Sequence, residues 1–177
     1  MNNHLNKLTL SALFLALCFV LPVITGNLTA IGNMLLPMHV PVLLCGFLCG
    51  WQYGLIIGAA APILRSIMFA MPPMFPVAVP MAFELAVYGL TAGLFYKIFP
   101  KKNVFIYVSL TLSMILGRLV WGFVRYIMTF AGTEFSLKMF IAGAITNALP
   151  GILIQLVLIP FIVMAVKYRG IAKKAVG

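Results

Sequence analysis

Glu84 is one of only two acidic residues in the chain, and it stands inside the apolar run 80–95. A carboxylate there accepts hydrogen bonds from amines, ring N–H groups or guanidinium groups, and it is costly within hydrocarbon unless such a donor lies beside it. Three arginines also interrupt apolar runs: Arg65, Arg118 and Arg125. Because one sequence does not fix helix rotation, all three are candidate partners. The pattern predicts a polar site around Glu84, formed by several apolar segments.

The segments that must position these groups have the composition of membrane helices. Hydrophobic residues make up 64% of the chain and charged residues 8%, and the mean hydropathy is +1.16, more than a soluble domain of this size can bury. A crossing needs roughly 20 apolar residues. The sequence therefore predicts an all-α integral membrane protein, in which residues 1–177 form one six-helix transmembrane domain. The predicted spans lie near residues 8–25, 36–50, 54–70, 80–96, 104–126 and 139–166.

Basic residues are distributed unevenly between the predicted connections. With the N-terminus inside, eight cations fall on the cytoplasmic side, whereas only Lys138, accompanied by Glu134, falls outside. Cytoplasmic connections of membrane proteins carry an excess of Lys and Arg. We therefore expect both termini to be cytoplasmic, and we interpret the cations as orientation signals, not as a nucleic-acid surface. The eight are Lys7, Lys97, Lys101, Lys102, Lys167, Arg169, Lys173 and Lys174.

Polar side chains recur at one depth in the outer half of the predicted bundle. At about 1.5 Å of rise per residue, four spans bring five such groups to a similar level, whereas groups that only snorkel would end at the interface. Arg118, Trp121 and Arg125 also share one helix face through their spacing. The sequence predicts a polar cavity that opens outward. Its candidate residues are Glu84, Arg65, Arg118, Arg125 and Asn147 at that level, Trp121 and Tyr88 beside them, and His39 and Asn33 at the rim.

Structural roles for the same residues stay open at this point. A buried ion pair between Glu84 and Arg65 or Arg118 would fix helix packing without binding any ligand. Arg125 has the position of a side chain that snorkels to the interface. His39 is equally well interpreted as a loop histidine without a ligand contact, and Tyr88 as a packing aromatic.

Several enzyme and pump classes are excluded by missing motifs. The chain has no P-loop, no His-Glu-x-x-His and no aspartate, so neither P-loop ATP hydrolysis nor zinc peptidase chemistry is expected. Its three cysteines lack the spacing of a metal site, and we expect neither a cofactor nor a metal. Ion-coupled transporters usually carry several intramembrane acids, whereas Glu84 stands alone. The residues favour binding over catalysis.

One family shares this whole pattern. The first span contains Ala12-Leu-Phe-Leu-Ala16, a small-x-x-x-small sequence that lets another helix approach closely. Together with six predicted spans and a basic cytoplasmic end, the chain resembles the substrate-binding S components of energy-coupling factor (ECF) vitamin transporters. The segments that resemble one branch are Leu36-Pro-Met-His-Val-Pro-Val-Leu-Leu-Cys-Gly46, Arg65-Ser-Ile-Met-Phe-Ala-Met-Pro-Pro73 and Ala82-Phe-Glu-Leu-Ala-Val-Tyr-Gly89.

The resemblance implies a function and a set of partners. It implies a six-helix protein of the bacterial cell membrane that captures a vitamin or precursor from outside, using the first outer loop and spans four to six. In that family Ala12 and Ala16 would dock on a transmembrane coupling subunit, and two cytoplasmic ATPases would drive release of the ligand.

The residues leave the ligand open between two chemistries. Glu84 with nearby aromatic side chains suits a flat nitrogen heterocycle such as hydroxymethylpyrimidine or pyridoxine, which we favour from the sequence. Pantothenate is the rival, because its carboxylate would pair with an arginine while Asn147 holds its amide or hydroxyls. A stand-alone secondary carrier for a small solute is the alternative class.

Overall fold

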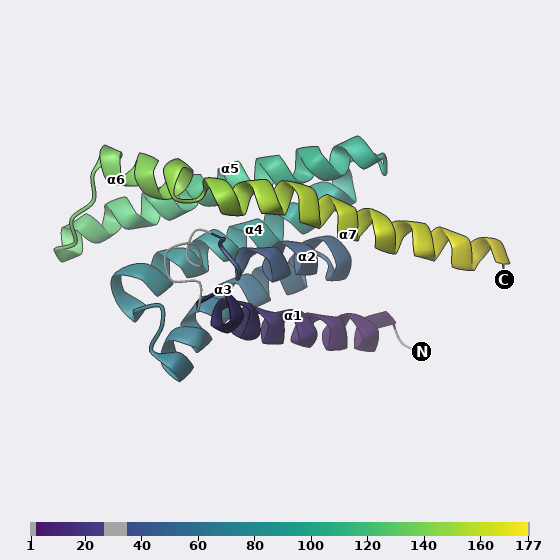
Figure 1. Ribbon diagram of the computed structural model, residues 1–177, viewed down its shortest axis with the longest axis horizontal. Helices are drawn as coiled ribbons and strands as arrows, with labels where there is room; N and C mark the ends of the chain where they lie inside the picture. The colour runs from purple at the N-terminus through teal and green to yellow at the C-terminus, as the bar shows by residue number, and fades with distance from the viewer. Residues whose placement is uncertain (1–2, 27–34, 177) are drawn as a thin grey trace.

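The structure, a computed structural model, describes residues 3–26 and 35–176 of the chain. These residues form helices and turns, without a strand among them, as the all-α prediction requires (Figure 1). The helical elements are α1 (Asn3–Gly26), α2 (His39–Cys49), α3 (Trp51–Phe69), η1 (Met74–Ala78), α4 (Val79–Ile98), α5 (Asn103–Ile127), η2 (Met128–Ala131), α6 (Leu137–Ile141), η3 (Ala142–Thr146) and α7 (Leu149–Val176).

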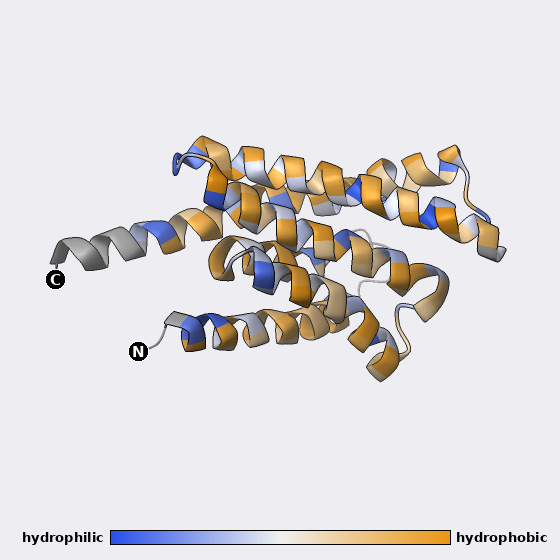
Figure 2. Ribbon diagram, turned by 180° about the vertical axis from the view of Figure 1, so that it is seen from behind, coloured by the Kyte–Doolittle hydropathy of each residue, from blue (hydrophilic) through white to orange (hydrophobic). Residues whose placement is uncertain are grey.

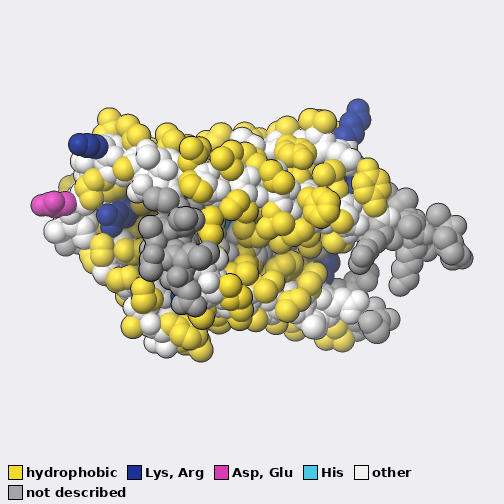
Figure 3. Space-filling model, viewed as in Figure 1, with side chains coloured by type: hydrophobic (Ala, Val, Ile, Leu, Met, Phe, Trp, Pro, Cys, Tyr) yellow, Lys and Arg dark blue, Asp and Glu magenta, His cyan; other side chains and the backbone are white. Residues whose placement is uncertain are grey.

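Within the described residues, five segments are long and apolar enough to cross a membrane. They are His4–Thr25, Trp51–Phe69, Met74–Ile98, Asn103–Phe130 and Leu137–Tyr168. Hydrophobic residues make up most of the helices in the ribbon of Figure 2, and in Figure 3 the charged side chains of the visible face gather toward the two ends. The protein is thus a multi-pass membrane protein.

The second predicted span differs from the other five. α2 has 11 residues, about 16 Å at 1.5 Å per residue, which is too short for the roughly 30 Å hydrocarbon core. Leu36 before it and Gly50 after it adopt positive φ angles of 50° and 107°, which interrupt the helix at both sides. Ten of its residues are buried, so α2 belongs to the core. Six full-length crossings are therefore not confirmed.

Two predicted boundaries also need correction. Residues 51–53, expected as a connection, form the first turn of α3, so Gly50 alone joins α2 to α3. The last predicted span, 139–166, is a composite of α6, η3 and α7 that begins at Leu137 and continues to Val176.

α4 is the central helix of the bundle. Its apolar segment is 61% buried, against 17–33% for the other four, because α2, α3 and α5 all pack against it. The approach to α3 is close: a Cβ added to Gly54 would lie 2.5 Å from the carbonyl oxygen of Gly89. Small residues let membrane helices make such backbone contacts. This packing fixes the rotation of α4 and therefore the direction of its one acidic side chain.

The chain ends lie together at one end of the bundle. The start of α1 and the end of α7 point the same way in Figure 1. There, Lys167 Nζ donates to the carbonyl of Lys101 at 2.7 Å and to Oδ1 of Asn103 at 3.0 Å. Residues 70–78, which contain Pro72, Pro73 and Pro76, lie at the opposite end beside the C-terminal end of α5 (Figure 1). The cationic connection and the polar site thus occupy opposite halves of the bundle.

Candidate functional site

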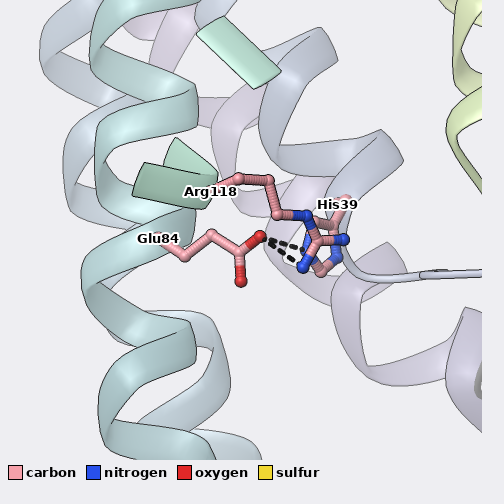
Figure 4. A network of polar contacts seen from close by, with 3 residues as sticks. All are labelled: His39, Glu84 and Arg118. Atoms are coloured by element: carbon pink, nitrogen blue, oxygen red, sulfur yellow. Dashed lines mark ion pairs between the residues drawn. The ribbon is translucent and has the colours of Figure 1, made fainter. Parts of the chain in front are cut away.

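Glu84 is the meeting point of three helices. Its Oε1 atom lies 2.9 Å from Nη1 of Arg118 on α5 and 3.4 Å from Nε2 of His39 at the start of α2, as Figure 4 shows. The Glu84 and His39 side chains are each 2% exposed and that of Arg118 is 12% exposed. The Arg118 contact has the distance of an ion pair, but its N–H groups are not aligned for a hydrogen bond, since Oε1 has no hydrogen-bond partner.

His39 reaches this carboxylate because α2 is short. A full-length span would place residue 39 near the membrane surface, as the predicted rim position assumed. Instead α2 begins within the core, so the first residue of the helix is buried beside Glu84. The structure corrects the rim position of His39 while keeping it among the residues of the site.

Tyr88 packs against His39. It stands one helical turn after Glu84 on the buried face of α4 and is 1% exposed. Its ring meets that of His39 edge to face, with centroids 5.4 Å apart. Gly117 on α5 makes room for it, because a Cβ there would overlap the Tyr88 ring. Tyr88 therefore positions His39 and does not line the cavity.

A cavity of about 790 Å³ opens beside these residues. We call it the Glu84 cavity. Its charged and aromatic lining comes from His39, Arg65, Glu84, Arg118 and Trp121, so four helices contribute. The volume is within the usual range for small-molecule sites. The remaining lining is Pro22, Val23, Thr25, Leu36, Pro37, Met38, Met71, Pro72, Pro73, Val77 and Met81.

Arg65 enters the cavity from α3. Its guanidinium carbon lies 5.8 Å from the centre of the Phe69 ring, and its Nη1 atom is buried without a hydrogen-bond partner. The two ion pairs found among the described residues join Glu84 to Arg118 and His39. Of the three arginines that the sequence offered to Glu84, the structure therefore selects Arg118 and leaves Arg65 without an acidic partner.

Trp121 forms a side wall of the cavity. Its indole stacks on Phe140 at 6.1 Å and meets Phe135 edge to face at 5.8 Å. Gly143 of η3 allows this contact, because a Cβ there would lie 2.7 Å from the indole ring. The short elements before α7 thus hold the aromatic side of the site.

Arg125 does not line the cavity. Its Nη1 donates to the carbonyl of Pro76 at 2.9 Å, and its guanidinium lies over the Phe135 ring at 5.3 Å. Pro76 belongs to the same connection as Met71 and Pro73, which do line the cavity. Arg125 therefore anchors the segment that borders the site.

The structure separates two predicted residues from the site. Asn147 is exposed and is not part of the cavity lining, because the buried face of this region carries Ala144, Ala148 and Gln155. Asn33 lies outside the described residues, as does most of the first outer loop.

Some relevant residues were not anticipated from the sequence. Met81 and residues 71–73 line the cavity. Their only signal in the sequence is that Met81 lies shortly before Glu84 and residues 71–73 shortly after Arg65. Gln155 is fully buried, and neither atom of its amide has a partner. It is the one polar side chain in the run 149–166, a signal that the sequence does carry.

The exposed face of α1 presents a second feature. Ala12 and Ala16 both lie on the exposed side of α1, next to exposed Leu8, Leu13 and Val20. This face is apolar, and the two alanine side chains are small, which would let another membrane helix approach closely.

Comparison with known proteins identifies the family. The model of the family described as "ECF transporter, substrate-specific component" matches residues 6–163. No curated protein and no solved structure matches the chain. The matched region contains the Glu84 cavity together with the Ala12 and Ala16 face of α1, and it leaves only the first five residues and the end of α7 outside. The protein belongs to the family of substrate-specific components of ECF transporters.

Proposed function

We propose that this protein captures a water-soluble vitamin or vitamin precursor from outside a bacterial cell and binds it in the Glu84 cavity. One observation carries the proposal: the cavity brings His39, Arg65, Glu84, Arg118 and Trp121 together from four helices. Apolar pockets with a few convergent polar groups are the usual form of small-molecule sites.

In this family, ligand binding and ATP hydrolysis are carried out by different subunits. A substrate-specific component is the binding subunit of an ECF importer, and it works with a coupling subunit and ATPases. The chain itself has no P-loop sequence. In our proposal two cytoplasmic ATPases hydrolyse ATP, and the present chain supplies ligand recognition.

The orientation follows from the distribution of cations. The end that holds Lys101 and Lys167 faces the cytoplasm in our proposal, because cytoplasmic connections are enriched in such residues. Both termini are then cytoplasmic and the Glu84 cavity faces outward, where the ligand is met. α1 presents Ala12 and Ala16 to the coupling subunit.

Two ligand chemistries compete for the cavity. Hydroxymethylpyrimidine or pyridoxine would use Glu84 as a hydrogen-bond acceptor, whereas pantothenate would use an arginine. The two ion-pair contacts of Glu84 Oε1 bear on this choice, because a heterocycle would have to share the carboxylate with Arg118 and His39.

Reconstitution tests the proposal. The protein should take up its vitamin into proteoliposomes when the coupling subunit and both ATPases are present with ATP on the cytoplasmic side, and it should not do so alone. Uptake by the isolated protein, driven by an ion gradient, would instead establish a secondary carrier. Chemical conversion of the ligand would establish an enzyme.

A further inference from the structure

We infer that the ligand of the Glu84 cavity is a small monoanion that carries a carboxylate, and that Arg65 is the residue that binds this carboxylate. The inference rests on the proposed function, since it names the class of molecule that the capture site accepts.

The charge of the cavity favours an anionic ligand. Two guanidinium groups, those of Arg65 and Arg118, line it together with one carboxylate, that of Glu84. With His39 neutral, the cavity has one positive charge in excess, and protonation of His39 would raise the excess. Arg65 is half-buried, with its Nη1 atom fully buried, and a partly buried charge without a counter-charge is still costly at membrane depth.

The chain holds little that could neutralise Arg65. Its acidic side chains are Glu84 and Glu134. Glu84 is already the partner of Arg118. Glu134 is exposed and does not line the cavity. The residues outside the described ranges, 1–2, 27–34 and 177, include no acidic side chain. A bound anion can provide the missing charge.

Several buried nitrogen atoms beside the cavity have no hydrogen-bond partner. Nη1 of Arg65, Nε and Nη2 of Arg118 and Nδ1 and Nε2 of His39 are buried and make no hydrogen bond. Guanidinium N–H groups are donors only, whereas each neutral imidazole has one donor. Oε1 of Glu84 is also buried without a hydrogen-bond partner, but the guanidinium N–H groups outnumber it. The site therefore offers an excess of donors, and a ligand rich in acceptor oxygens satisfies it. A carboxylate suits a planar guanidinium because it can accept two parallel hydrogen bonds.

The same arrangement disfavours a basic ligand. Oε1 of Glu84 lies between Arg118 and His39, so a protonated amine would share this carboxylate with both groups and would meet the positive charges of Arg65 and Arg118 in the same cavity. The charge excess of one unit also favours a carboxylate over a phosphate dianion. Apolar lining from Met71, Val77 and Met81 provides the surface for the remainder of the molecule.

A panel of matched compounds tests the class. The full chain in detergent is screened by thermal stabilisation and by calorimetry with pairs that differ only in the acid: pantothenate and panthenol, nicotinate and nicotinamide, biotin and biotinamide. Hydroxymethylpyrimidine, pyridoxine and inorganic phosphate complete the panel. We expect one acid to bind and its neutral counterpart to bind at least about 30-fold more weakly, the range for a lost charge-assisted interaction.

Arg65→Gln tests the residue. It should weaken binding of the acid by about 10- to 100-fold without changing the affinity for its neutral counterpart. Arg65→Lys keeps the charge without the planar fork and should lose less. Lys138→Gln removes one exposed positive charge outside the cavity and should bind as the wild type does. A melting temperature measured without ligand verifies that each variant is folded.

The outcomes distinguish a failure of the carboxylate inference from a failure of the proposed capture function. Binding of a neutral heterocycle without binding of any acid would overturn the inference and leave the capture function standing, as would tighter binding of phosphate. Binding of an acid that Arg65→Gln leaves unchanged would overturn the assignment to Arg65. If no compound of either class binds, and reconstituted complexes import none, the capture function itself is wrong.

Discussion

Nη1 of Arg118 on α5 lies 2.9 Å from Oε1 of Glu84 on α4. The contact is buried, and His39 of α2 approaches the same oxygen. Three helices are thus connected through one carboxylate at the edge of the cavity. A group in this position stabilises the bundle and shapes the binding site at once, so the two roles must be separated by experiment.

Glu84→Gln should destabilise the protein by about 3 kcal/mol, because it leaves the Arg118 guanidinium buried without its counter-charge. Denaturant unfolding in detergent measures this. The double variant Glu84→Gln/Arg118→Gln should be more stable than Glu84→Gln alone, since the uncompensated charge is gone. Equal stability of Glu84→Gln and the wild type would show that the ion pair contributes nothing to the fold.

Folded Glu84→Gln should bind an acidic ligand as well as or better than the wild type, because its loss increases the positive charge around the ligand. Calorimetry with whichever acid the compound panel selects checks the direction. A strong loss of binding in a folded variant would instead indicate a basic ligand that Glu84 contacts.

Gly89→Ala should destabilise the bundle by about 2 kcal/mol or more, because the new methyl group would overlap the backbone of Gly54. Helix propensity alone predicts the opposite sign, a gain of roughly 1 kcal/mol. Ile56→Ala on the lipid-facing side of α3, where the side chain is 61% exposed, is the control and should stay near the wild type. A more stable Gly89→Ala variant would contradict the close helix contact.

Ala12→Trp and Ala16→Trp should abolish uptake by the reconstituted importer while leaving ligand binding unchanged, because both side chains lie on the exposed face of α1 and neither lines the cavity. Val157→Trp adds bulk to an exposed position of α7 and should transport normally. Full transport by both alanine variants would place the coupling subunit elsewhere.

Arg125→Gln should increase the dissociation rate of the ligand by about 3- to 10-fold, because it removes the hydrogen bond that anchors Pro76 beside the cavity. Stopped-flow measurement of ligand release provides the readout. An unchanged rate would mean that residues 71–76 keep their place without Arg125.

Composition and depth were enough to predict a helical membrane protein and to bring Glu84, Arg65 and Arg118 to one level. They did not select Arg118 over Arg65, because that choice depends on helix rotation, which close contacts such as Gly54 with Gly89 set. Hydropathy also read α2 as a full span, since a buried core helix is as apolar as a lipid-facing one. The sequence put Asn147 at the same level, but its side chain is exposed and does not line the cavity, because depth does not specify the helix face.

The isolated chain should bind one vitamin molecule in the Glu84 cavity, without ATP or partners. Calorimetry on the purified protein measures this, with two variants for comparison: Met81→Trp, which fills the cavity, and Phe83→Trp, which adds bulk at a position 54% exposed on the same helix. We expect one site per chain, lost in Met81→Trp and retained in Phe83→Trp. Equal binding by a folded Met81→Trp variant would contradict it.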